Sequence, residues 1–223
     1  MLFATWDGFA SQQDLVNKIR EREEYLDLEM NSCSLTRFLV DILLEEYPDA
    51  KFILTIRDCY SWLDSMLNHQ NWSQSTKPVH PTWKRMNDLR LHWNKEGEDE
   101  YAPEEQILAQ NNLYTLNGYL SYWAQQNRKV LTTVPQDRLL VVRTHEISQE
   151  IDRIADFLGV PSETLDRTKA HSFKARQKSY FLSQIDRQFL NQKFNTHCKS
   201  LMDEFFPDFR GIPDALVSTT VNA

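Results

Sequence analysis

The hydrophobic positions near the start of the chain follow first a helical and then a strand-like period. Residues 11–24 are polar and helical, and Ser11 and Asp14 have the spacing of a capping box. The next segment, EYLDLEMNS, alternates polar and apolar residues, which predicts a strand with one polar face over residues 25–31. Apolar residues then recur at i, i+3, i+4, i+7 and i+8 over residues 35–43, which predicts a second helix.

Strands and helices continue to alternate along the rest of the chain. Two short apolar runs, 52–56 and 139–142, are typical of buried parallel strands. Helical spacing predicts further helices at 60–70, 116–134, 148–158 and 183–205. Residues 72–103 carry three Trp among prolines and charges without a clear period, so we expect an irregular or short-helical insertion on the substrate side. This order predicts an α/β fold of three layers, a parallel sheet flanked by helices.

Length and charge limit the classes of protein that fit. The 223 residues suit a single domain over 1–223, and 25 Lys and Arg against 32 Asp and Glu give a net charge of −7. This acidic balance disfavours nucleic acid as a partner. No apolar run is long enough to span a membrane, and no signal peptide precedes the first helix, so we expect a cytoplasmic protein.

Cysteine and glycine usage excludes several kinds of site. Cys33, Cys59 and Cys198 are too few and too scattered for a disulfide scaffold or a zinc site, so we expect reduced thiols and no metal. Only five glycines occur, and no two have the spacing of a dinucleotide fingerprint or of a Walker P-loop. A P-loop kinase-like enzyme is therefore disfavoured.

Candidate chemistry lies where the predicted strands end, because ligands bind outside the carboxyl ends of strands in open α/β sheets. Arg57 follows one strand, and the hydroxyl of Ser65 comes eight residues later, in the second turn of the next helix. A cation and a hydroxyl near a helix N-terminus can bind phosphate. An ion pair between Arg57 and Asp58 is the structural alternative. At the end of the later strand, His145 is expected to be structural.

Two segments resemble a known family. KFILTIRDCYSWLDSMLNH is similar to the 3′-phosphate-binding segment of sulfotransferases that use 3′-phosphoadenosine 5′-phosphosulfate (PAPS). RLLVVRTHEISQEIDRIADFLGVP resembles a later strand, turn and helix of that family. The resemblance covers roughly residues 25–70 and 115–207. It implies the P-loop NTPase-like architecture of sulfotransferases, here with the first strand missing, and therefore a nucleotide-binding transferase.

The resemblance also implies roles for individual residues. PAPS would be the donor, and the acceptor a hydroxyl of a small molecule or sugar. Glu29 matches the position of the general base, and Arg57 and Ser65 match the 3′-phosphate ligands. For Glu29 the structural alternative is an ordinary solvated carboxylate. Nothing in the sequence indicates the oligomeric state.

A basic stretch supplies further candidate ligands for the nucleotide. Residues 167–185 contain five Lys or Arg and no Asp or Glu, within a chain of net charge −7. The family carries a basic loop here that closes over the 3′-phosphate, which makes Lys174, Arg176 and Lys178 candidates. A solvated basic turn before the last helix is the alternative for each of them.

One part of the family pattern is missing. Its sulfotransferases begin with a strand and a Gly/Ser/Thr-rich loop that wraps the 5′-phosphosulfate, whereas the residues before Glu29 read ATWDGFASQQDLVNKIRERE. We therefore expect either that the natural product begins upstream of Met1 or that the chain is an inactive relic. A non-catalytic, sulfotransferase-like binding or interaction protein is the alternative function.

Overall fold

The chain forms two compact units. The computed structural model describes residues 11–32, 36–76, 81, 84, 85, 87, 91, 100–167, 178–209 and 211–217. The first unit comprises residues up to 52 together with 129–139, and the second comprises 53–128 together with 140–223.

The first unit is built on two helices. Helix α2 (Gln12–Leu26) begins at the predicted capping box, in which Ser11 and Asp14 exchange hydrogen bonds. A 3-10 turn (Thr36–Phe38) precedes helix α3 (Val40–Glu46), so the second predicted helix is confirmed in part, and it begins later than expected. The two helices share an apolar cluster of Leu15, Val16, Ile19 and Ile42.

The strand predicted over residues 25–31 is wrong. Helix α2 continues to Leu26 and ends at Asp27, whose φ of 45° is left-handed and whose N–H donates to the Glu23 carbonyl. Residues 27–32 contain no strand. An alternating pattern forms a strand only where a neighbour takes its backbone hydrogen bonds, and no strand pairs with this segment in the described part of the chain. The side chains of Tyr25 and Met30 are accordingly exposed, by 87% and 67%.

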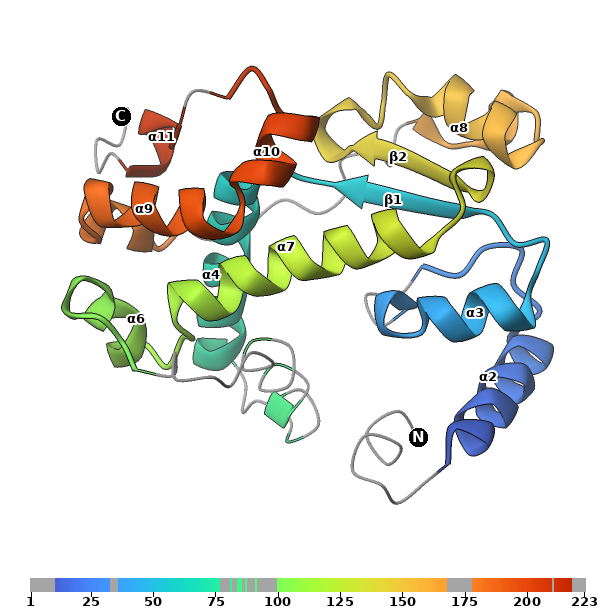
Figure 1. Ribbon diagram of the computed structural model, residues 1–223, viewed down its shortest axis with the longest axis horizontal. Coiled ribbons are helices and arrows are strands. Elements are labelled where there is room, and N and C mark those ends of the chain that lie inside the picture. Colours follow the sequence, from blue (N-terminus) through green and yellow to red (C-terminus); the bar gives the residue numbers. More distant parts are fainter. Residues whose placement is uncertain are drawn as a thin grey trace. The chain divides into compact units, whose positions relative to one another are not determined.

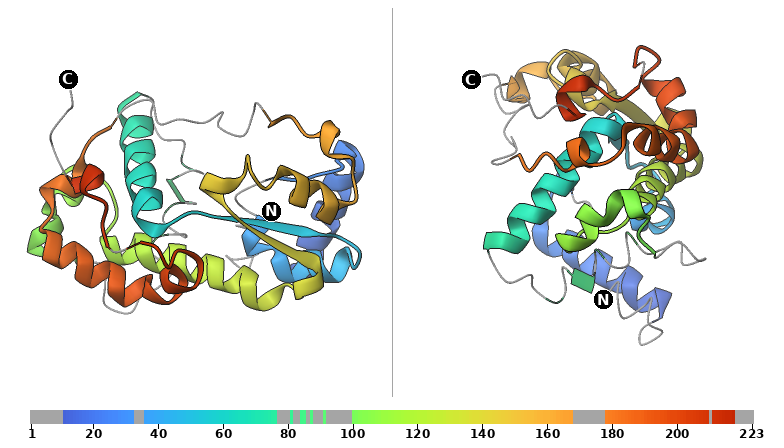
Figure 2. Two further views of the ribbon diagram at one scale, coloured as in Figure 1. Left: turned by 90° about the horizontal axis from the view of Figure 1, so that it is seen from above. Right: turned by 90° about the vertical axis from the view of Figure 1, so that its left-hand side faces the viewer.

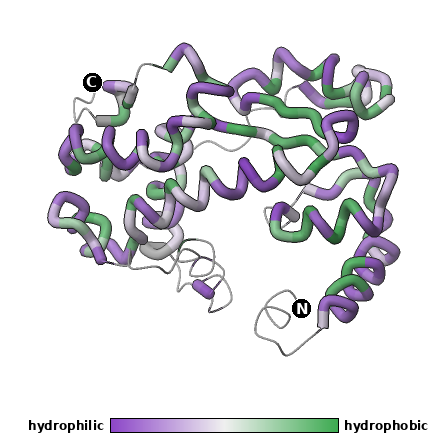
Figure 3. Tube along the Cα trace, in the orientation of Figure 1, coloured by the Kyte–Doolittle hydropathy of each residue, from purple (hydrophilic) through white to green (hydrophobic). Residues whose placement is uncertain are grey.

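The sheet confirms both predicted apolar strands. Strand β1 (Phe52–Ile56) pairs with β2 (Leu139–Arg143), and both point the same way in Figure 1, so the strands are parallel. Both are hydrophobic along most of their length (Figure 3). Over the described residues, the fold is thus a mixed α/β arrangement with a two-stranded parallel sheet.

Helices make up most of the second unit. They are α4 (Cys59–Thr76), α6 (Gln106–Gln110), α7 (Leu116–Thr133, whose last turn belongs to the first unit), α8 (Ile151–Leu158), α9 (Arg187–His197), α10 (Lys199–Phe205) and α11 (Asp214–Val217). Short 3-10 turns lie at Pro103–Glu105, Gln136–Arg138 (in the first unit), Thr144–Glu146, Ser162–Thr164 and Phe181–Gln184. Helices α9 and α10 lie along α7, as Figures 1 and 2 both show, and Arg128 of α7 contacts Ser200 and Glu204 of α10.

Of the four helices predicted after residue 59, three are confirmed, and the fourth is wrong because it is divided into shorter helices. Helix α8 ends where expected, at Gly159, whose φ is 78°. Helix α4 extends to Thr76, so the expected irregular insertion begins later, and most of that insertion lies outside the described residues. The single helix expected over 183–205 is divided, because the Asp186 side chain caps a new helix at the Phe189 N–H and Cys198 separates α9 from α10.

Candidate functional site

The turn from β1 into α4 is held by Asp58. Its carboxylate accepts a hydrogen bond from the Ser61 backbone N–H at 2.8 Å, and its carbonyl accepts one from the Trp62 N–H. The Asp58 side chain is thus a helix cap, and Asp58 is 6% exposed. The first turn of α4 is therefore fixed directly after the strand ends.

Arg57 is oriented by a hydroxyl rather than by a direct ion pair. Its Nε donates to Ser61 Oγ at 2.9 Å, and Ser61 Oγ in turn donates to the Asp58 carboxylate. Among the described residues, no direct ion pair joins Arg57 to Asp58, the alternative that the sequence left open, because Ser61 Oγ lies between them. On the main-chain side, the Trp123 indole N–H donates to the Arg57 carbonyl at 3.1 Å. The main-chain carbonyl and the Nε of Arg57 are thus both fixed by hydrogen bonds. The two terminal amino groups of its guanidinium have no hydrogen-bond partner among the described residues.

Ser65 lies one helical turn beyond Ser61 on α4. Residues four apart share a helix face, so the hydroxyls of Ser61 and Ser65 lie on the same side of α4. Ser65 is half-buried, and no hydrogen bond joins it to another described residue. Sequence reasoning singled out Ser65 and missed Ser61, although an Asp at the N-cap reaches the backbone N–H of the third helical residue, which here is Ser61.

The pKa of Asp64, which also lies on α4, depends on the charges near this face of the helix. Burial raises the pKa of Asp64 above its ordinary value, while the charge of Lys178, a hydrogen bond from the Asn68 side chain and the charge of Arg57 act in the opposite direction. Both cations are therefore within electrostatic reach of one carboxylate on α4. Lys178 is exposed, whereas Lys174 and Arg176 lie outside the described residues. Of the three predicted basic-loop candidates, only Lys178 is described, and its charge acts on the same carboxylate as that of Arg57.

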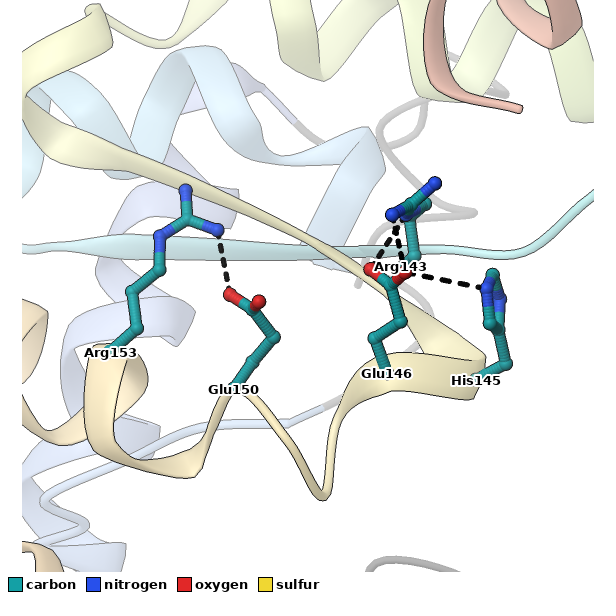
Figure 4. Close-up of polar contacts among 5 residues, drawn as sticks. All are labelled: Arg143, His145, Glu146, Glu150 and Arg153. Carbon is teal, nitrogen blue, oxygen red and sulfur yellow. Dashed lines mark hydrogen bonds and ion pairs between the residues drawn. The ribbon is translucent and has the colours of Figure 1, made fainter. Parts of the chain in front are cut away.

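The end of β2 carries a second group of charged residues. The Thr144 hydroxyl donates to the Ile56 carbonyl at 3.1 Å, which ties this end to the end of β1. Arg143 holds the Glu146 carboxylate with two nitrogens, its Nε donating to Oε2 at 2.6 Å (Figure 4). His145 Nε2 lies 3.6 Å from the same carboxylate, and its ring lies beside Phe206. This paired arrangement fits the structural role expected for His145.

Glu29 lies in the first unit, on the irregular segment that replaces the predicted strand. Its side chain is exposed. The segment is tied back to α2 by Asn31, whose side chain donates to Glu23 Oε1 at 3.0 Å. The role of general base therefore stays a prediction for Glu29.

Neither a metal-binding cluster nor a membrane-spanning helix occurs in the described part of the chain. No group of three or more His, Cys, Asp or Glu is placed to hold a metal ion. None of the described helices is both long enough and apolar enough to cross a bilayer.

Comparison with known proteins identifies the family. A family model described as Sulfotransferase domain matches residues 27–167, more than half of the chain. The chain belongs to this sulfotransferase family. The resemblance drawn from the two sequence segments is thereby confirmed, and both the β1–α4 turn and the β2 end fall inside the matched region.

This sulfotransferase-family chain also resembles a curated protein of Aspergillus versicolor named "Ava biosynthesis cluster protein M". The two are 33% identical over 132 residues, which are 56% of this chain and 46% of the relative. The chain thus spans less than half the length of that relative. No solved structure matches the chain.

Proposed function

We propose that this sulfotransferase-family domain transfers a sulfuryl group from PAPS to a hydroxyl of a small molecule or sugar. The observation that carries the proposal is the β1–α4 turn, where Arg57 is held at both ends and keeps its terminal amino groups for another acceptor. Ser61 and Ser65 share one face of α4, and Lys178 adds a second cation. The Ser61 hydroxyl is used in orienting Arg57, so the donors left for a phosphate group are those of Arg57, Ser65 and Lys178. We extend the proposal to the P-loop NTPase-like architecture of the family and to a cytoplasmic location.

In the proposed reaction the bond from sulfur to the bisphosphate breaks as a bond from sulfur to the acceptor oxygen forms. The proton of the acceptor hydroxyl passes to a base, for which Glu29 is the proposed residue. Charge develops on the leaving bisphosphate, so cations that fix it contribute by positioning and by electrostatic stabilisation. Arg57, Ser65 and Lys178 would bind the 3′-phosphate, together with the predicted ligands Lys174 and Arg176.

Equilibrium binding of adenosine 3′,5′-bisphosphate tests the nucleotide site. Calorimetry should give micromolar affinity for the unchanged chain. Arg57→Ala should weaken it about 10- to 100-fold, since a hydrogen bond to a charged group contributes roughly 1.5–3 kcal/mol. Arg153→Ala is the matched control, because Arg153 pairs with Glu150 on the surface and should leave affinity unchanged (Figure 4). Absence of binding at millimolar bisphosphate would refute the proposal.

The role of Glu29 needs a separate measurement. Radiolabelled sulfuryl transfer from PAPS to a panel of phenols and sugars should be abolished by Glu29→Gln, while bisphosphate affinity stays within about twofold, because a base acts in the transition state. An equal loss of binding and transfer would remove Glu29 from this role.

A non-catalytic, sulfotransferase-like binding protein is the second candidate function. It is favoured by one observation, the exposed and irregular segment on which Glu29 lies. Bisphosphate binding that depends on Arg57, without transfer to any acceptor in the panel, would support this candidate over the enzyme.

A further inference from the structure

Asn68 is a buried amide on α4 whose two polar ends are both engaged by main-chain groups. It is 3% exposed and lies three residues beyond Ser65. Its Nδ2 donates to the Asp64 carbonyl at 2.7 Å, and its Oδ1 accepts from the Ser179 backbone N–H at 2.6 Å. Because one partner is a carbonyl and the other an N–H, the orientation of the amide is fixed by its partners.

Ser179 is held by α4 at a second point. The Asn71 side chain donates to Ser179 Oγ at 2.9 Å. Asn68 and Asn71 are three residues apart and so lie on one side of the helix. Together they contact both the main chain and the side chain of Ser179, although Ser179 is more than 100 residues away in sequence.

The residue before Ser179 is Lys178, whose position is therefore set by this contact. Lys178 is exposed, and its charge and that of Arg57 both act on Asp64. Within the described residues, no ion pair joins either cation to Asp64; Arg57 uses only its Nε, on Ser61, and Lys178 is open to solvent. A lysine side chain alone is flexible, and ordering it costs free energy when a ligand binds. A fixed main chain beneath Lys178 lowers that cost.

We propose that Asn68 is a positioning residue of the nucleotide site, which holds the main chain next to Lys178 against α4, the helix that follows Arg57, so that a phosphate of the bisphosphate meets two cations. This inference rests on the proposed function and deepens it. It differs from the assignment of Lys178 as a ligand, because Asn68 itself touches no part of the nucleotide and acts through the main chain of Ser179.

A double-mutant cycle in bisphosphate binding tests this inference. Asn68→Ala and Lys178→Ala should each weaken binding about fivefold, and the double variant should bind no more weakly than either single variant, because both changes remove the same contribution. Asn127→Ala is the matched control: Asn127 is a buried amide on α7 that also donates to the carbonyl four residues earlier, and its removal should change affinity less than twofold.

The outcomes separate this inference from the proposed function. A roughly 25-fold loss in the double variant, or unchanged affinity in Asn68→Ala, would overturn the positioning role while binding that depends on Arg57 stands. No binding by the unchanged chain would overturn both. If Asn68→Ala does not fold, Asn71→Ala removes only the second contact with Ser179; it should weaken binding about twofold, and that loss should vanish in a Lys178→Ala background.

Discussion

Glu105 is a buried carboxylate whose removal should destabilise the start of α7. It is 1% exposed, and its two oxygens accept hydrogen bonds from the backbone N–H groups of Leu116, at 2.7 Å, and Ala102, at 3.2 Å. Leu116 is the first residue of α7, where backbone N–H groups have no partner within the helix. Thr115 caps only the Gly118 N–H, at 3.1 Å, so Glu105 completes the helix start.

The size of the effect follows from these two hydrogen bonds. Glu105→Ala leaves two backbone donors without an acceptor, and each buried, unsatisfied donor costs about 1–3 kcal/mol. Part of that loss is offset because the variant no longer has to desolvate a carboxylate. We expect the free energy of unfolding to fall by about 3 kcal/mol. For a chain of this length such a loss lowers the melting temperature by roughly 6–12 °C.

Urea denaturation followed by tryptophan fluorescence measures this change, with thermal unfolding as a second probe. Glu105→Gln keeps one acceptor oxygen and should lose about half as much stability. The neighbouring Glu104 is exposed, so Glu104→Ala should change stability by less than about 0.5 kcal/mol. If Glu105→Ala matched Glu104→Ala to within that margin, the cap would contribute nothing and the reasoning would be refuted.

Two other substitutions test the site and the packing. Burial raises the pKa of Asp64 despite the charges of Lys178 and Arg57, so its ionised form destabilises the fold at neutral pH. Asp64→Asn should therefore increase the free energy of unfolding at pH 7. This gain should disappear as the pH falls towards about 4, where the carboxylate of the unchanged chain takes up a proton. Calorimetry of the same variant should show about threefold tighter bisphosphate binding, because the substitution removes a negative charge that repels the negatively charged ligand. A Cβ at Gly118 would lie 2.4 Å from the Leu91 carbonyl oxygen, so Gly118→Ala should cost about 2 kcal/mol or more in urea denaturation; a neutral result would contradict this close packing.

The elements that could be predicted from the sequence are those whose pattern and packing agree. Strands β1 and β2 are apolar runs that the sheet buries, and α8 ends at a glycine with positive φ, so local signals and tertiary structure coincide. Residues 25–31 show the opposite case. Their alternation is real, but the preceding helix extends into the segment and no neighbouring strand is described that could pair with it. A period of two residues cannot reveal whether a partner strand exists.

The same division applies to the candidate site. Arg57 and Asp58 could be predicted because they follow a recognisable strand directly, and each acts within one turn of chain. Asn68 could not, since its partner Ser179 is distant in sequence and an asparagine within a helix carries no local signal of a long-range contact. The predicted base Glu29 rests on family resemblance, which assigns a role to a position without showing its surroundings.

The separation of the two strands along the chain has a consequence for how the protein is made. β1 ends at Ile56, and β2 begins at Leu139, with α4, α6 and the whole of α7 between them. During synthesis β1 therefore stays unpaired until the ribosome has released the intervening residues and β2. Pairing over such a distance is intrinsically slow. Until then the apolar edge of β1 is open to other nascent chains, so expression at low temperature or with chaperones should favour yield.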